Sequence, residues 1–254
     1  MTLGLTVTLA AWGAPARAQF DKYGHFNQNA TEFADVCSSP TGGSRACGPI
    51  ALMNSLVFLQ NTYPKLFGNT LIGNDPHATA VKISEFMGCS ACGGTDTTKF
   101  FEGKKKYLES VAPKKILSKR YVKPTAADLK KEIDHKEDVE LFIGYYEGEK
   151  FVGGHYVTLY ALSDLKLSFV DPGGLDGKDG GKIDGATDES INYAFNDALK
   201  QLLLSGYDGT PAGAQARIDF AFAESPAPEP AVWALMLLGF GATGLFLRRP
   251  AALA

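Results

Sequence analysis

The chain has 254 residues, with 25 Lys and Arg against 28 Asp and Glu, and a formal net charge of −3 at pH 7. This balance excludes a protein that binds nucleic acid mainly through a strongly basic surface. About 205 residues lie between two terminal segments of different character, which is enough for one domain with a sizeable core.

The N-terminal residues 1–18 have the pattern of a secretory signal peptide. Residues 3–12 form an apolar run, and Ala16-Arg17-Ala18 then matches the A-x-A cleavage pattern. The basic region that normally opens such a peptide is missing, because no Lys or Arg precedes this pattern. A buried N-terminal helix is the alternative interpretation.

The first half of the central segment predicts irregular structure followed by helices. Residues 19–46 hold many Asn, Ser, Gly and Thr, which favour loops. Gly48-Pro49 then opens a run that is apolar on more than one face, which predicts a buried helix over about 48–62. Further helices are expected near 77–87, 97–111 and 125–136. The Lys residues at 104–106 and 114–115 are interpreted as a solvated helix face.

The hydrophobic period changes after this helical part. Segments rich in β-branched and aromatic residues predict the strands of an antiparallel sheet, namely 140–146, 155–162, 165–170 and 217–222. A helix is expected over about 188–204, between the last two strands. Helices first and then mostly strands indicate an α+β fold.

Three short segments hold the residue types that nucleophilic catalysis requires. Cys47 begins the buried helix, where the helix dipole and the free N–H groups favour a thiolate. His155 opens one strand and would act as a base toward the thiol, and Asp171 closes the next and would hold the imidazole tautomer. If the Ser163-Asp164 region is the turn, these two strand ends lie side by side. We therefore predict a triad of Cys47, His155 and Asp171.

Each triad residue also has an ordinary structural explanation. A Cys before a helix is usually a small buried residue or half of a disulfide, and a His on a strand is usually a satisfied polar residue. Asp-Pro at the end of a strand usually makes a turn. The order and the context of the three segments together favour the triad.

The same segments resemble the papain-like cysteine peptidases. Cys47-Gly48-Pro49 followed by a helix with Asn54, then Gly-His-Tyr-Val-Thr-Leu-Tyr at 154–160, then Val-Asp-Pro at 170–172, is most similar to the branch related to bacteriocin-processing, double-glycine peptidases. The resemblance implies a papain-like α+β fold without a cofactor, and hydrolysis of peptide bonds in a peptide or protein substrate through a Cys47 thioester. It implies His155 as the base and Asp171 as the orienting residue.

The sequence departs from this family where the oxyanion hole is expected. Such enzymes often place a Gln a few residues before the nucleophile, but residues 38–46 contain none. Gln28 is a candidate across an inserted loop, or another donor substitutes. The departure keeps a second interpretation open, a non-catalytic matrix or biofilm protein on a peptidase-like scaffold. An amidase or a transglutaminase-like acyl transferase with the same triad is a third.

Four Cys in an exported chain allow disulfides. Cys89 and Cys92 have C-x-x-C spacing, but no second pair stands at the spacing of a zinc site, and the two Gly that follow argue against a redox pair. A structural disulfide is the favoured interpretation. If Cys47 is free, Cys37 can pair with Cys89 or with Cys92. A Cys37–Cys47 bridge is the sharpest alternative, because it would abolish the enzyme interpretation.

The loop over residues 171–184 is rich in Gly and Asp. Its carboxylates could gather calcium, but their spacing matches no EF-hand. A flexible loop beside the active site is the plainer interpretation. His25, His77 and His135 stand in polar or helical contexts, and no role is assigned to them.

The C-terminal residues 225–254 resemble the PEP-CTERM sorting signal. Pro228-Glu229-Pro230 precedes an apolar run over 231–247, and Arg248-Arg249 closes it. The run is at the short limit for a membrane helix, and the Arg pair would stay cytoplasmic. An ordinary single-pass anchor is the alternative.

The resemblance to the PEP-CTERM signal implies processing by an exosortase at the inner membrane. It implies a final location in the cell envelope or the extracellular matrix of a Gram-negative bacterium. The sequence thus predicts a signal peptide over 1–18, a peptidase domain over 19–224 and a sorting tail over 225–254.

Overall fold

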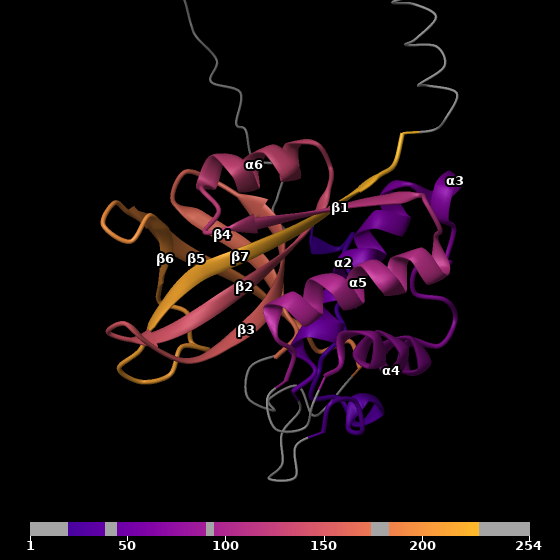
Figure 1. The fold of residues 1–254 in the computed structure, drawn as a ribbon, viewed down its shortest axis with the longest axis horizontal. Helices are drawn as coiled ribbons and strands as arrows, with labels where there is room; N and C mark the ends of the chain where they lie inside the picture. The colour runs from indigo at the N-terminus through magenta and orange to yellow at the C-terminus, as the bar shows by residue number, and fades with distance from the viewer. Residues whose placement is uncertain (1–19, 39–44, 90–93, 174–182, 229–254) are drawn as a thin grey trace, which may run out of the picture.

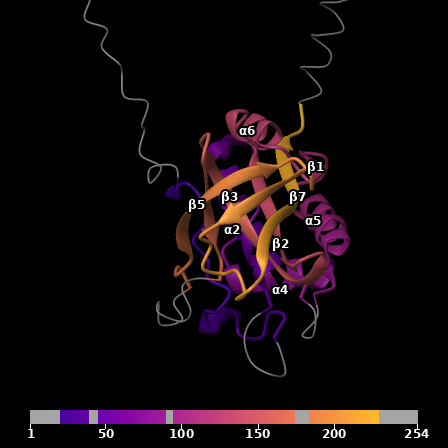
Figure 2. The same cartoon turned by 90° about the vertical axis from the view of Figure 1, so that its left-hand side faces the viewer.

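The computed structural model describes residues 20–38, 45–89, 94–173 and 183–228. It has helices packed against an antiparallel sheet (Figures 1 and 2), which confirms the predicted α+β class. The predicted signal peptide and the apolar run at 231–247 lie outside the described residues. Within the described part of the chain, no helix is both long enough and apolar enough to cross a membrane.

Among the described residues, every helix except the last precedes the first strand. They are η1 (Thr31–Phe33), α2 (Cys47–Thr62), α3 (Pro64–Phe67), α4 (Pro76–Met87), α5 (Thr97–Val111) and α6 (Ala126–Asp134). Four of the five helices predicted from the sequence are confirmed within one or two residues at each end. Their starts are well marked, since the Asp75 and Asp96 side chains cap α4 and α5, and Thr125 forms a capping box with Asp128 before α6.

Seven strands form one sheet in which every pairing is antiparallel. They are β1 (Ile116–Val122), β2 (Asp138–Glu147), β3 (Lys150–Leu162), β4 (Lys166–Asp171), β5 (Thr187–Asn196), β6 (Gln201–Ser205) and β7 (Gln215–Pro226). The strand order is β1-β7-β2-β3-β4-β5-β6, and β6 also pairs with the first half of β7. This extra pairing closes six of the strands into a ring.

The helix predicted over 188–204 is wrong, because these residues form β5 and β6. Ile191 is buried between exposed neighbours, and Leu202 and Leu204 are buried on either side of a less buried residue, which is the alternation of a strand. Pairing of β5 with β4 and of β6 with β7 overrides the helix-forming residues at 198–204. The sequence also gave no sign of β1, whose polar side chains lie at the edge of the sheet.

The assignment of a solvated face to the Lys residues at 104–106 is wrong for Lys104. Its side chain is fully buried and contacts the carboxylates of Glu140 on β2 and Glu224 on β7. Lys105 and Lys106 are exposed, as expected. Two strands that lie side by side only in the folded sheet supply the partners, so the sequence around Lys104 could not indicate them.

The two faces of the sheet bury separate apolar cores. The face toward the helices packs against α2, α4 and α5 through side chains that include Phe142, Tyr156 and Phe222. The face that the ring encloses carries mainly aliphatic side chains, among them Leu141, Ile143, Val157, Leu204 and Ile218. The central strands are therefore buried on both faces, as in β2, where every residue from Asp138 to Tyr145 is buried.

Helix α2 is the central helix of the domain. All of its residues from 48 to 56 are buried, which explains why its apolar residues follow no single face. The Oγ1 of Thr158 on β3 donates a 2.7 Å hydrogen bond to the Ala51 carbonyl oxygen. This contact fixes α2 along β3 and brings the start of the helix to the part of β3 that carries His155.

Candidate active site

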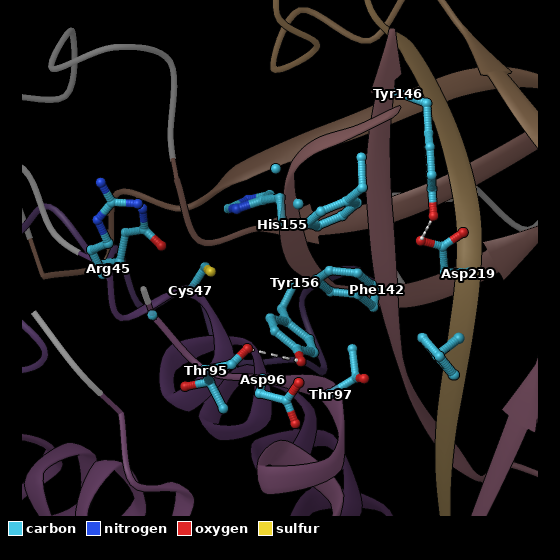
Figure 3. A pocket seen from close by; sticks show the side chains of 16 residues that line it. Arg45, Cys47, Thr95, Asp96, Thr97, Phe142, Tyr146, His155, Tyr156 and Asp219 are labelled. Carbon is cyan, nitrogen blue, oxygen red and sulfur yellow. Dashed lines mark hydrogen bonds between the residues drawn. The ribbon is translucent and has the colours of Figure 1, made fainter. Parts of the chain in front are cut away.

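A cavity of about 760 Å³ opens at the N-terminus of α2 (Figure 3). Its lining includes Cys47 from α2 and His155 from β3, together with Gln28 and Arg45 from the irregular N-terminal segment. The opposite side of the cavity is formed by β2 and β7. The structure thus brings the predicted nucleophile and the predicted base into one open site.

Cys47 is the first residue of α2 and forms no disulfide. Burial raises the pKa of its thiol, but the hydrogen bond and the Coulombic attraction to His155 more than offset this. Hydrogen bonds from the backbone N–H groups of Tyr156 and Gly48 contribute further, and the net pKa of the thiol lies below its ordinary value. These donors stabilise the thiolate, which is the nucleophilic form of Cys.

His155 lies between Cys47 and Asp171. Its Nε2 is 2.7 Å from Oδ1 of Asp171, which leaves the other ring nitrogen for the thiol. Burial lowers the pKa of His155, but the attraction and the hydrogen bond to Asp171, and then those to Cys47, raise it to about 10. The raised pKa of His155 favours the imidazolium at neutral pH, and the lowered pKa of Cys47 favours the thiolate beside it.

Asp171 is held by two donors besides His155. The Tyr207 hydroxyl donates to Oδ2 at 2.5 Å, and the Gly173 N–H donates to Oδ1 at 2.6 Å. Burial raises the pKa of Asp171, but His155, Tyr207 and Gly173 together hold it below the ordinary value. The carboxylate is thus ionised and fixed in position by groups from three segments of the chain.

The turn between β3 and β4 places His155 and Asp171 side by side, as the sequence predicted. The two strands are antiparallel neighbours with Thr158 opposite Val170. Gly154 allows β3 to pack tightly here, because a Cβ at this position would lie 2.3 Å from Cζ of Phe142. Tyr207 was missed, because it lies just beyond the helix expected over 188–204 and reaches Asp171 only through the turn that follows β6.

Gln28 lies in the same cavity, although it is far upstream of Cys47 in the sequence. Its backbone N–H donates a 2.8 Å hydrogen bond to the Pro172 carbonyl oxygen, beside Asp171. Its Oε1 is buried and has no hydrogen-bond partner among the described residues. The Gln28 backbone is therefore anchored next to the triad, and the Nε2 end of its amide, not this oxygen, is the group that would donate to an oxyanion.

A disulfide links Cys37 to Cys89, so the Cys37–Cys47 bridge is not formed. The bridge supports the loop before the nucleophile, because the Arg45 N–H donates to the Cys37 carbonyl at 3.3 Å and the Arg45 carbonyl lies 3.7 Å from the Cys89 sulfur. Cys92 lies outside the described residues. The pairing leaves Cys47 available for chemistry.

The other candidate groups considered from the sequence contribute no described residue to the lining of the cavity. Most of the Asp- and Gly-rich loop, residues 174–182, lies outside the described residues. His25 contacts the Phe20 carbonyl, His77 contacts Asp35, and His135 ends α6, and these histidines do not line the cavity. Among the residues that the structure describes, His155 is thus the histidine that faces Cys47.

No model of a known protein family matches the chain, and no curated protein matches it either.

Proposed function

We propose that this protein is a cysteine peptidase with a papain-like fold. One observation carries the proposal: a free Cys at a helix N-terminus pairs with a His, and a buried, hydrogen-bonded carboxylate holds that His 2.7 Å away. The order of the three residues along the chain and their places on a helix and two neighbouring strands support the papain-like assignment. A cavity that is open to solvent leaves room for an extended peptide.

In the proposed mechanism, the Cys47 thiolate attacks the carbonyl carbon of the scissile peptide bond. The developing oxyanion accepts hydrogen bonds from a backbone N–H at the start of α2 and from the Nε2 of the Gln28 side-chain amide. The His155 imidazolium then protonates the leaving amine, and a thioester on Cys47 remains. Neutral His155 takes a proton from water, the hydroxide attacks the thioester, and the acid product leaves as the thiolate–imidazolium pair re-forms.

Asp171 does not take a proton in this scheme. It keeps the imidazole in one orientation and stabilises its positive charge, as carboxylates do in related triads. The donors from Tyr207 and Gly173 keep Asp171 itself in place. The position of Gln28 favours catalysis over the non-catalytic scaffold, because the missing upstream Gln was the reason to consider that alternative.

The proposed setting is outside the cytoplasm. The Cys37–Cys89 disulfide is of the kind that persists in oxidising compartments, which agrees with the predicted signal peptide and sorting tail. The substrate would then be a peptide or protein at the cell envelope or in the extracellular matrix. Exosortase processing and the membrane helix at 231–247 belong to the same proposal.

Alkylation of the purified full chain tests the peptidase proposal. Iodoacetamide and an epoxide thiol inhibitor are added at neutral pH, and labelled sites are located by peptide mass spectrometry, which separates Cys47 from Cys92. We expect Cys47 to react much faster than the thiol of glutathione, and casein to be digested. Both effects should be lost in Cys47→Ala, and both should fall sharply in His155→Ala. Labelling no faster than glutathione, with no casein digestion, would refute the proposal.

A further inference from the structure

The wall of the cavity opposite the triad carries a second buried carboxylate, Asp219. In Figure 3, Asp219 and Tyr146 lie across the cavity from Cys47, with Phe142 and Tyr156 between the two groups. Asp219 lines the cavity but touches none of the triad residues. The mechanism above gives it no part.

A backbone irregularity in β7 directs the Asp219 side chain into the cavity. On β7, Phe220 pairs with Phe142 of β2 and Ile218 pairs with Ile143, so Asp219 is the extra residue of a β-bulge. Bulges re-aim side chains and are frequent next to active sites. A Cβ on Gly144 would lie 2.1 Å from Oδ2 of Asp219, so the carboxylate occupies the space that this Gly leaves free.

The Asp219 carboxylate is fixed by neutral hydrogen-bond donors. The Tyr146 hydroxyl donates to Oδ2 at 2.8 Å, and the Gln201 amide donates to Oδ1. The nearby Arg217 donates to the Gly148 and Gln215 oxygens and lies over the Tyr146 ring, while Lys123 contacts the Leu199 carbonyl.

No salt bridge to Asp219 occurs within the described parts of the chain. Burial raises the pKa of Asp219, although the hydrogen bonds from Tyr146 and Gln201 and the attraction of the nearby Arg217 and Lys123 act to lower it. A cation that a ligand brings to this carboxylate would supply the direct, charge-assisted hydrogen bond that the described residues do not provide.

The approach to Asp219 is aromatic. Phe142, Phe151, Phe220 and Tyr146 line this part of the cavity, and Phe151 is 51% exposed. Such walls suit the methylene stem of a long basic side chain, whose charged end then reaches a carboxylate. An acidic or a short polar side chain would find repulsion or an apolar surface instead.

The position of Asp219 relates it to the scissile bond. His155 is on β3 and Asp219 is on β7, with β2 between them. Two strand spacings amount to roughly 10 Å, which is about the length of three residues in an extended chain. A side chain that reaches Asp219 therefore belongs to a residue close to the bond that Cys47 attacks.

We propose that Asp219 is a specificity residue that binds the Lys or Arg side chain of a peptide substrate, within about three residues of the scissile bond. The inference rests on the proposed peptidase function, which it extends by naming the class of substrate. Tyr146 and Gln201 act as positioning residues that hold the carboxylate toward the cavity.

Peptide binding to the full-length Cys47→Ala protein tests this inference without requiring turnover. Fluorescein-labelled decapeptides of Ser, Gly and Ala carry one Lys, which is moved through every position, and a matching set carries norleucine. Fluorescence anisotropy gives the affinities. In one register we expect Lys to bind at least about tenfold more tightly than norleucine, and acetylation of that Lys to remove the preference.

The same ratio is then measured in Cys47→Ala/Asp219→Asn, where we expect it to fall to about twofold or less. Asp188→Asn is the matched control, because Asp188 also accepts a hydrogen bond from a Tyr hydroxyl but lies outside the cavity. An unchanged Lys preference in Asp219→Asn, or no register that prefers Lys, would overturn the inference. If the Asp219→Asn protein folds poorly, acetylation of the peptide Lys still tests the charge interaction, because it leaves the protein unchanged.

The two proposals fail in different ways. Rapid alkylation of Cys47 without any preference for Lys would keep the peptidase and remove the Asp219 site. A Lys preference that depends on Asp219, together with an unreactive Cys47, would keep the binding site and remove the peptidase.

Discussion

Replacement of Asp171 by Asn is the most direct test of the electrostatic design of the site. The change keeps the shape of the side chain but removes the charge that lies 2.7 Å from His155. Burial alone lowers the pKa of His155, so without Asp171 the pKa should fall from about 10 toward or below the ordinary 6.5. The imidazolium then no longer stabilises the thiolate above that pH.

The size of this effect follows from the pKa of His155. A change from about 10 to 6.5 corresponds to about 5 kcal/mol at 1.36 kcal/mol per pH unit, shared between Asp171 and Cys47. Loss of even a third of this, about 1.5 kcal/mol, reduces the population of the thiolate–imidazolium pair by roughly tenfold at a fixed acidic pH.

The assay is the rate of Cys47 alkylation by iodoacetamide between pH 4 and 9. In the wild type we expect the thiolate to persist well below the pKa of an ordinary thiol, about 8.5. In Asp171→Asn the midpoint should move upward, and the rate at pH 6 should fall at least about tenfold. Asp188→Asn, which removes an exposed carboxylate bonded to Tyr160, should leave the profile unchanged. Superimposable profiles for Asp171→Asn and the wild type would refute the reasoning.

Three further predictions concern the surroundings of the site. Tyr207→Phe removes a donor to the buried triad carboxylate, which should cost about 1–3 kcal/mol of unfolding free energy and slow alkylation in acid. Tyr193→Phe, which loses only an exposed contact to a carbonyl, should do neither. Gly144→Ala forces a Cβ to 2.1 Å from the bulge carboxylate and should lower the unfolding free energy by about 1–3 kcal/mol in urea denaturation. Gly153→Ala, whose nearest neighbour lies at 3.7 Å, should be nearly neutral, and equal losses would contradict the steric argument. Cys37→Ser opens a disulfide across a separation of 52 residues and should cost about 4 kcal/mol, after which a reductant should have no further effect on stability.

The pH dependence of stability follows from the same pair. His155 has a raised pKa in the folded chain, so its contribution is fully present below the unfolded value of 6.5 and is lost as the pH rises toward about 10. Asp171 has a lowered pKa, so its contribution is present above its ordinary value and is lost as the pH falls through the folded one. The stability difference between wild type and Asp171→Asn should therefore be largest from about pH 4 to 6.5.

Much of the site was readable from the sequence because its signals are local. Cys47 before Gly-Pro marks a helix start, and His155 and Asp171 stand on two neighbouring strands joined by a short turn, although His155 lies within β3 and not at its start. These features depend on neighbouring residues, and the structure reproduces them. The helices with Asp or Thr caps could be predicted for the same reason.

The parts that could not be predicted depend on contacts between distant segments. Residues 188–204 hold helix-forming side chains, and only pairing with β4 and β7 makes them strands. Gln28 reaches the site through the fold of the N-terminal segment, and Tyr207 through the turn after β6. Asp219 looks like any polar residue of a strand until the bulge opposite Phe142 is known.

The closed ring also has a consequence for the way in which the protein is made. Strand β7 pairs with β1, β2 and β6, and it is the last strand in the part of the chain that the structure describes. The ring cannot close until β7 has been synthesised, and long-range pairing of this kind is slow to form. A chain that ends before Gln215 would therefore leave β2 and β6 with open edges. The protein should stay without its complete sheet during most of its synthesis, which is compatible with passage through a membrane in an unfolded form.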